Sequence, residues 1–329
     1  MTVSIDRSRI EALPKGRVPD FFIVGQFKSG TTALYEMLKS HPQIFMPELK
    51  ELWFHSPELR AQALARGSTT RPTTLDGYLS LFEAARPEQR AGEATPSYLI
   101  SHEAAGRIAA LQPDARIIAI LREPASFLRS FHLQNLQNHS ETEKDLRKAI
   151  ELVEERREGR SLPPHAGRPQ ELLYTDHVHY VEQLQRYRAV FAPEQILVLI
   201  YDDFRDDNEA TVRRVLRFLE VDDTQPVAVT EANPTVRVRS PRTSDFVRSL
   251  YMGSGPATRA IKRAIKTLTP RALRREALAV ERRLQWGAPR PPDEQLMLEL
   301  RRRFKGEVVA LGEHLDRDLV GLWGYDRLD

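Results

Sequence analysis

Three short apolar runs divide the chain, and a segment with helical spacing of its apolar residues follows each. The runs are FFIV at 21–24, RIIAIL at 116–121 and ILVLIY at 196–201. Runs of this length and composition predict central strands that are buried on both faces of a sheet. Because helix patterns alternate with them, we predict an α/β fold with an open, mostly parallel sheet flanked by helices.

The remaining pattern is mostly helical. Helices are predicted near 31–38, 102–111, from about 125, and at 180–191, 209–219 and 294–315, with short strands within 43–46 and 90–100. Neither a repeat nor a low-complexity tract interrupts the pattern, which predicts a single domain over 1–329 with a peripheral lead-in at 1–18.

Two polar stretches lie outside this alternation of strands and helices. Residues 57–89 are predicted to form a surface excursion with a helix near 75–85. In 134–160, charged residues that include Glu141 and Arg156 recur at helical spacing, which indicates a solvated helix face. Prolines and glycines in 159–172 predict a loop that covers a ligand site. His132, His139 and His165 are too irregularly spaced to predict a metal site.

Composition narrows the possible chemistry. The 329 residues contain no cysteine, which excludes disulfides, zinc-thiolate sites and a thiol nucleophile. The first 17 residues lack the apolar core of a signal peptide, and no window of eighteen apolar residues occurs. We therefore expect a soluble, cytoplasmic protein. Arginine outnumbers lysine, as in proteins of GC-rich bacterial genomes.

The stretch 19–38 carries the most informative pattern, a strand that enters a glycine-bounded loop and then a helix. Gly25 ends the strand, Gly30 closes the loop, and Ser29 or Thr31 is predicted to cap the helix. Main-chain amides of such a loop point at the helix start, where the helix dipole adds about half a positive charge. Lys28 adds a full charge, so we predict an anion site. Its residues are Gln26, Phe27, Lys28, Ser29, Gly30, Thr31 and Thr32.

The loop differs from the Walker A motif of kinases and ATPases. That motif places lysine directly after the second glycine, followed by Ser or Thr for magnesium. Here Thr31 follows Gly30 and the lysine lies inside the loop. A nucleoside-triphosphate kinase remains an alternative, and an absolute magnesium requirement would favour it. A plain glycine-rich turn is the other alternative.

Acidic residues lie among aromatic ones in two further segments. The segment KELWFH contains Lys50, Glu51 and His55, and RAGEATPSYLI contains Glu93. Apolar rings disfavour the charged form of a carboxylate, which is how general bases are tuned. Glu51, Glu93 and His55 are therefore candidate bases. The alternatives are a surface loop with an aromatic anchor for the first segment and a structural buried acid for Glu93.

A basic residue also follows the second apolar run. Arg122 lies where that strand meets a helix, and Ser130 lies on the helix. This is the ligand-binding edge of an open α/β sheet, and the guanidinium fork suits a phosphate. A salt bridge at the strand end is the alternative for Arg122. Asp202 and Asp203 follow the third run, where we predict a strand end or a helix cap rather than a metal site.

The pattern G-x-x-K-S-G-T-T after an apolar strand resembles the 5′-phosphosulfate loop of sulfotransferases that use 3′-phosphoadenosine 5′-phosphosulfate (PAPS). The resemblance extends over roughly 19–325 and is similar to the carbohydrate and heparan type. It implies a P-loop-like sulfotransferase fold and transfer of the sulfuryl group to a carbohydrate, glycolipid or small-metabolite hydroxyl or amine. The product nucleotide would be PAP, and no metal would take part.

The resemblance also implies residue roles. The loop lysine, Lys28, would contact the 5′-phosphate and the bridging oxygen, and Glu51 would be the general base, with His55 as the second candidate. Arg122 and Ser130 would hold the 3′-phosphate. Ala94 replaces a lysine that many relatives carry, so Lys50 is a substitute candidate. The excursion 134–175 would border the acceptor site, and Trp323 in the closing Leu-x-x-Trp element would be structural.

The segment 237–285 is basic. Residues 237–283 include thirteen lysines and arginines but only three acidic residues. In the family such a segment closes over the 3′-phosphate, which makes Arg237, Arg239 and Arg242 candidates. A basic amphipathic helix within 257–285 also suits peripheral contact with an anionic membrane or an acidic acceptor, and a solvated face is the alternative. No recognised nucleic-acid motif accompanies the charge. A non-catalytic nucleotide or membrane-surface binding protein remains a further alternative. The sequence does not indicate the oligomeric state.

Overall fold

A five-stranded parallel sheet forms the centre of the molecule. The computed structural model describes residues 17–65, 71–164, 166, 168–227, 237–238, 286–287 and 291–328. The strand order is β2-β3-β1-β4-β5, and every neighbouring pair is parallel. The strands are β1 (Phe21–Gly25), β2 (Ile44–Phe45), β3 (Arg90–Ala94), β4 (Arg116–Leu121) and β5 (Ile196–Ile200). The predicted open parallel sheet is confirmed.

The six helices that the apolar spacing predicted are present, and further helices accompany them. They are α1 (Thr31–Lys39), α2 (Pro57–Ala65), α3 (Leu75–Leu79), α4 (Ala104–Leu111), α5 (Pro124–Gln137), α6 (Leu146–Glu151), α7 (Val153–Arg157), α8 (Tyr180–Arg188), α9 (Tyr201–Asp206), α10 (Asn208–Phe218), α14 (Glu294–Leu315) and α15 (Leu319–Leu322). Short 3-10 turns include η3 (Pro96–Tyr98), η4 (Pro169–Leu172) and η5 (Tyr174–Val178). Tyr201, predicted to end the third strand, instead begins α9.

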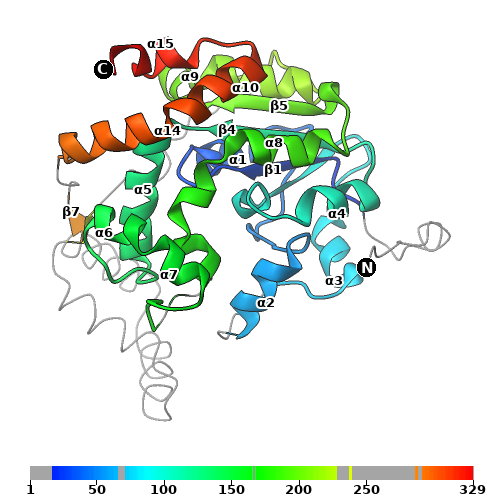
Figure 1. Cartoon of the computed structure of the whole chain (residues 1–329). Coiled ribbons are helices and arrows are strands. Elements are labelled where there is room, and N and C mark those ends of the chain that lie inside the picture. The colour runs from blue at the N-terminus through cyan, green and yellow to red at the C-terminus, as the bar shows by residue number, and fades with distance from the viewer. Residues whose placement is uncertain are drawn as a thin grey trace.

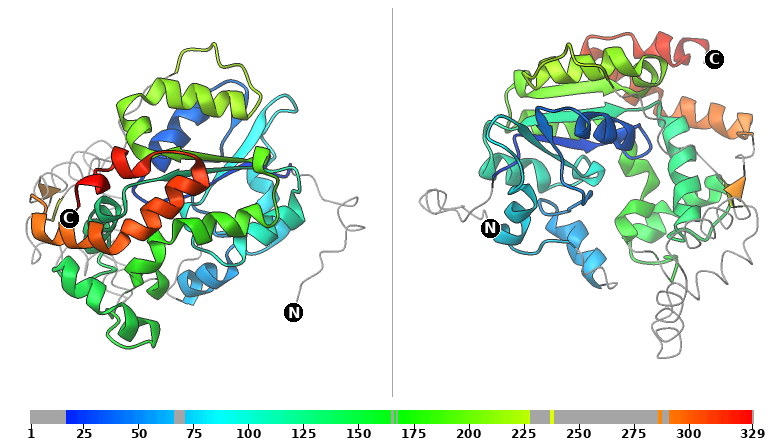
Figure 2. Two further views of the ribbon diagram at one scale, coloured as in Figure 1. Left: turned by 45° about the horizontal axis from the view of Figure 1, so that its top comes forward. Right: turned by 180° about the vertical axis from the view of Figure 1, so that it is seen from behind.

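Both faces of the sheet are covered, because alternate residues of each strand enter different cores. Phe22 and Val24 pack with residues of α4, α8 and α14. Phe21 and Ile23 pack with residues of α1 and α10 on the other face. Figure 2 shows α1 and α10 on one side of the strands and α8 and α14 on the opposite side. All five residues of β1 are buried, as the continuous apolar run predicted.

The prediction of a solvated face for 134–160 is wrong at two residues. Glu141 and Arg156 form a buried ion pair with Oε2 and Nη1 at 2.7 Å and side chains only 0% and 1% exposed. Tyr174 donates a further hydrogen bond to Glu141 (3.2 Å). Periodicity shows that charges share a helix face, but it does not show whether that face meets solvent or a buried partner. The Tyr174 hydrogen bond links this pair to the segment 169–178.

The C-terminal elements close over the end of β5. Asp203 accepts two hydrogen bonds from Arg317 (2.5 and 2.7 Å), and Asp202 accepts one from the Trp323 indole (2.9 Å). Asp202 and Asp203 therefore stabilise the packing of α14 and α15 onto α9 (Figure 1). The predicted structural role of Trp323 is confirmed. No helix among the described residues combines the length and apolarity needed to cross a membrane.

Candidate functional site

The glycine-bounded loop joins β1 to α1 at the carboxyl edge of the sheet. Lys28 and Gly30 both have positive φ, 56° and 87°. A side chain on Gly30 would also collide with the Phe204 ring at 2.8 Å, so glycine is required there. Gly30 is the N-cap of α1 and offers no side-chain cap, which corrects the predicted capping by Ser29 or Thr31. The first amides of α1 thus lack a side-chain acceptor and are free to bind an anion.

Gln26 and Phe27 shape this loop from within the protein. The Gln26 side chain accepts a hydrogen bond from the Phe27 amide (2.8 Å) and donates one to the carbonyl of His177 (2.6 Å). The Phe27 ring stacks on Phe131 with centroids 5.3 Å apart. Ser29 Oγ donates to the Phe27 carbonyl (3.2 Å). The side chains of Gln26 and Phe27 are buried, so they position the main chain of the predicted anion site.

Arg122 lies against the same loop. Its Nη1 donates to the carbonyl of Lys28 (2.9 Å), and its guanidinium lies over the Tyr201 ring at 4.6 Å. Tyr180 fixes the main chain of Arg122 by donating to its carbonyl (2.9 Å). Burial, and then the charge of Arg122, lowers the pKa of the Lys28 ammonium. Two neighbouring cations at a helix start favour a bound anion, which relieves their repulsion.

Ser130 is buried farther along α5, the helix that begins just after Arg122. Arg129, on the same helix, has a lowered pKa because of burial and the charge of Arg122. The structure therefore places the strand-end arginine and its helix beside the loop. Arg237 belongs to a two-residue strand, β6 (Arg237–Val238), paired with β7 (Trp286–Gly287). Arg239, Arg242 and the basic helix predicted within 257–285 lie outside the described residues.

Lys50 reaches the start of α1 from the other side, and Glu51 follows it. Lys50 Nζ donates to Thr32 Oγ1 (3.0 Å) and lies 4.5 Å from the centroid of the Tyr35 ring. Glu51 has a positive φ of 55°, and its amide donates to the Ala94 carbonyl at the end of β3 (2.9 Å). Glu51 is partly exposed. The structure thus brings Lys28, Thr32 and Lys50 together at one helix N-terminus, with Glu51 next to Lys50 in the chain.

A cluster that the sequence analysis missed lies beside Glu51. Two guanidiniums lie over the Trp53 ring, that of Arg71 at 4.9 Å and that of Arg168 at 4.4 Å. Arg168 forms an ion pair with buried Glu171 (2.7 Å). Burial raises the pKa of Glu171 to about 7, with Arg168 opposing the shift and the charge of Glu51 adding to it. The local sequence pattern gave no signal for this cluster, because it joins two segments, around 53–71 and 168–171, that are about a hundred residues apart in the chain.

Glu93 and His55 lie in the core instead. Glu93 is 1% exposed and accepts hydrogen bonds from the hydroxyls of Tyr78, Thr95 and Tyr98 (2.5–2.7 Å). Burial raises its pKa. His55 is 2% exposed and lies edge-on to aromatic rings, and burial lowers its pKa to about 3. These enclosed positions favour structural roles for both residues and leave Glu51 as the accessible candidate base.

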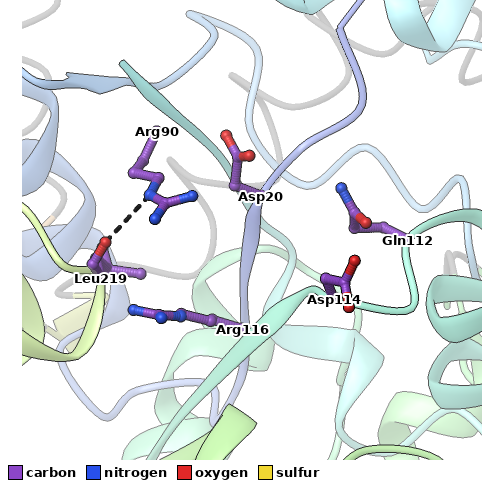
Figure 3. A pocket seen from close by; sticks show the side chains of 6 residues that line it. All are labelled: Asp20, Arg90, Gln112, Asp114, Arg116 and Leu219. Atoms are coloured by element: carbon purple, nitrogen blue, oxygen red, sulfur yellow. Dashed lines mark hydrogen bonds between the residues drawn. The ribbon is translucent and has the colours of Figure 1, made fainter. Parts of the chain in front are cut away.

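A cavity of about 250 Å³ lies at the opposite edge of the sheet, at the amino ends of β1, β3 and β4 (Figure 3). Arg90 pairs with Glu220 (3.1 Å) and donates to the Leu219 carbonyl (3.2 Å), while Arg116 also pairs with Glu220. Ligands of open α/β sheets bind at the carboxyl ends of the strands. We therefore assign this cavity to structure. Within the described residues, no group of three or more His, Asp or Glu side chains is placed to hold a metal ion.

A family model described as "Sulfotransferase family" matches residues 19–225, which is more than half of the chain. The chain belongs to the sulfotransferase family. Heparan sulfate glucosamine 3-O-sulfotransferase 6 of Homo sapiens is 34% identical over 120 residues, 36% of this chain and 31% of the relative. The human bifunctional heparan sulfate N-deacetylase/N-sulfotransferase 3 is 28% identical over 212 residues, 62% of this chain and 22% of the relative.

This sulfotransferase thus spans about a third or less of the length of these curated relatives. It also resembles the crystal structure of a sulfotransferase from Alicyclobacillus acidocaldarius. The two are 27% identical with a TM-score of 0.58, and the match covers 72% of this chain and 94% of that chain. The loop, Arg122 and the Lys50–Glu51 segment all lie inside the part that the family model matches.

Proposed function

We propose that this sulfotransferase moves the sulfuryl group of PAPS to a hydroxyl or amine of a carbohydrate acceptor. The observation that carries the proposal is the convergence of Lys28, Arg122 and Lys50 on the uncapped start of α1, with the Glu51 segment alongside. A bisphosphate nucleotide carries negative charge at both ends and matches this distribution. The names of the curated relatives support the choice of a carbohydrate acceptor.

The loop amides, Lys28 and Thr32 would hold the phosphosulfate, with Ser29, Gly30 and Thr31 completing the cradle. Arg122 and Ser130 would hold the 3′-phosphate, and Arg237 and Arg239 are proposed to join them. These residues suit PAPS because they offer hydrogen-bond donors and positive charge without requiring a metal ion. A sulfuryl group carries less charge than a terminal phosphoryl group, so lysine and main-chain donors suffice for its transfer.

The reaction would proceed as an in-line displacement. Glu51 takes the proton from the acceptor hydroxyl, and the acceptor oxygen forms a bond to sulfur. The bond between sulfur and the 5′-phosphate oxygen breaks, and PAP leaves with that electron pair. Lys28 would stabilise the charge on the leaving oxygen. Lys50 would assist it, in place of the lysine that many relatives carry at the position of Ala94.

Calorimetric titration of PAP without magnesium tests the proposal. We expect micromolar binding to the wild type and a loss of at least about tenfold in Lys28→Ala, because a charge-assisted hydrogen bond is removed. Lys39→Ala is the matched control, since Lys39 lies at the other end of α1 and pairs with Glu48. ATP binding that requires magnesium, with no binding of PAP, would reject the proposal in favour of a kinase.

A further inference from the structure

A second cavity lies between the two excursions on the side of the sheet that carries α4 and α8. Its volume is about 430 Å³, within the range of small-ligand sites. Glu58 of α2 and Arg157 of α7 contribute from opposite excursions, and Gln183 and Arg186 contribute from α8. In Figure 1, α2 and α7 lie below α8. The cavity therefore joins segments that are far apart in the sequence.

The cavity adjoins the anion loop through His177. The His177 carbonyl accepts the hydrogen bond from Gln26 of the loop (2.6 Å), and His177 is also one of the residues that line the cavity. His177 Nε2 also lies 3.2 Å from the carbonyl of Glu171, the acid next to Glu51 in the missed cluster. His177 thus links the cavity to the loop that we propose as the donor site.

The fixed charges around the cavity largely cancel. Arg157 donates two hydrogen bonds to Asp176 (2.8 and 2.9 Å), and Arg186 donates to Glu182 (2.8 Å). The remaining carboxylate, that of Glu58, accepts a hydrogen bond from Ser101. Burial holds the pKa of His177 at about 4, so its ring is neutral at physiological pH. The cavity has no excess of positive charge to attract an acidic ligand.

Four residues that line the cavity each carry a buried polar atom without a hydrogen-bond partner. These atoms are Glu58 Oε2, His177 Nδ1, Gln183 Oε1 and Arg186 Nε. Native proteins leave few such atoms unpaired, and each needs an explanation. Two of them, Glu58 Oε2 and Gln183 Oε1, end side chains that can turn them towards a ligand by rotation about the terminal bonds. The set includes acceptors and a donor, which matches a ligand whose groups both donate and accept.

We propose that this cavity binds an uncharged sugar unit of the acceptor, adjacent to the unit that receives the sulfuryl group. Hydroxyl groups both donate and accept, which satisfies the four unpaired atoms. Ile100 and Leu173 supply apolar surface for the C–H face of the ring. The inference rests on the proposed function and deepens it, because the balanced charges select a neutral sugar over the acidic sugars of heparan sulfate.

Saturation-transfer NMR on the PAP-saturated protein tests the inference. The probes are two mixtures, one of neutral disaccharides and one of uronic-acid and sulfated disaccharides. We expect signals from the neutral mixture, reduced about fivefold or more in Gln183→Met, which loses a hydrogen-bonding group. Ile100→Phe, which fills the cavity without touching that group, should reduce them as well. The matched control is Gln185→Leu, on the exposed face of the same helix.

Signals from the acidic mixture alone, no signal from either mixture, or unchanged signals in both variants would overturn the inference. Thermal unfolding and PAP titration of each variant separate a lost sugar site from a misfolded protein. Failure of the wild type to bind PAP would instead reject the proposed function. In that case, binding of neutral sugars to the wild type that both variants lose would still support a sugar site in the cavity.

Discussion

Arg122 donates a hydrogen bond from Nη1 to the main-chain oxygen of Lys28, 2.9 Å away and 94 residues earlier in the chain. The contact joins the ends of β4 and β1, which are adjacent parallel strands. It fixes the side chain of Arg122 against the main chain of Lys28. The two motifs are therefore in direct contact, and a change in Arg122 should affect the loop as well as the proposed contact with the 3′-phosphate.

Arg122→Ala should weaken PAP binding by about ten- to a hundredfold, because it removes a charge-assisted hydrogen bond and a positive charge. Arg122→Lys should recover only part of the affinity, since lysine lacks the planar fork. Calorimetry of both variants measures this. Arg188→Ala, an exposed arginine of α8, is the control. Equal affinity in Arg122→Ala and wild type would remove Arg122 from the nucleotide site.

Glu51→Gln should lower kcat by about a hundred- to ten-thousandfold while PAP affinity stays near that of the wild type, because only proton removal is lost. Radiolabelled sulfuryl transfer to a carbohydrate acceptor, together with PAP titration, measures both quantities. Glu48→Gln changes a neighbouring exposed carboxylate and should retain turnover. Normal turnover in Glu51→Gln would exclude Glu51 as the base.

His55→Phe should keep kcat within a small factor of the wild type, because the ring is enclosed by aromatic side chains and does not meet the acceptor. The substitution preserves the packing and loses the contact with the Tyr78 hydroxyl (3.2 Å). A loss of a hundredfold or more in a correctly folded variant, as for a missing general base, would contradict the structural assignment.

Glu93→Leu should destabilise the fold by at least about 3 kcal/mol, because three buried hydroxyls lose their acceptor. Urea denaturation gives the free energy of unfolding. Glu83→Leu, at an exposed position, serves as the control and should change stability by less than about 0.5 kcal/mol. A Glu93 variant of normal stability with lost turnover would point to a catalytic role.

Glu171 should make stability fall as pH rises. Its pKa is about 7 in the folded protein against an ordinary 4.5. Between these values the folded protein holds a proton that the unfolded chain releases, so the free energy of unfolding decreases with pH through this window. The full effect is about 3 kcal/mol, at about 1.4 kcal/mol per pKa unit.

Glu171→Gln should abolish this decrease, and urea denaturation at pH 5 and pH 8 measures it. Glu194→Gln changes an exposed carboxylate and is the control. A wild type and a Glu171→Gln variant with parallel pH profiles would show that Arg168, only 2.7 Å away, keeps Glu171 ionised at both pH values.

The sequence by itself determined the features that depend on neighbouring residues. The continuous apolar runs predicted β1, β4 and β5, and the helical spacing predicted α14 over the same residues that the structure shows. Gly25 and Gly30 predicted the loop, since only glycine adopts the positive φ at Gly30 without strain. The parallel sheet then required the ends of β1 and β4 to meet at one edge, which brought Arg122 to the loop.

Only the tertiary structure decided which ionisable groups are buried and what they contact. Glu51, Glu93 and His55 had similar local surroundings in the sequence, yet Glu51 is partly exposed and the other two are enclosed. The pair Glu141–Arg156 and the cluster of Trp53, Arg168 and Glu171 depend on how the excursions fold back onto the sheet. Burial and long-range contact set the roles of these groups, and neither follows from the spacing of residues along one segment.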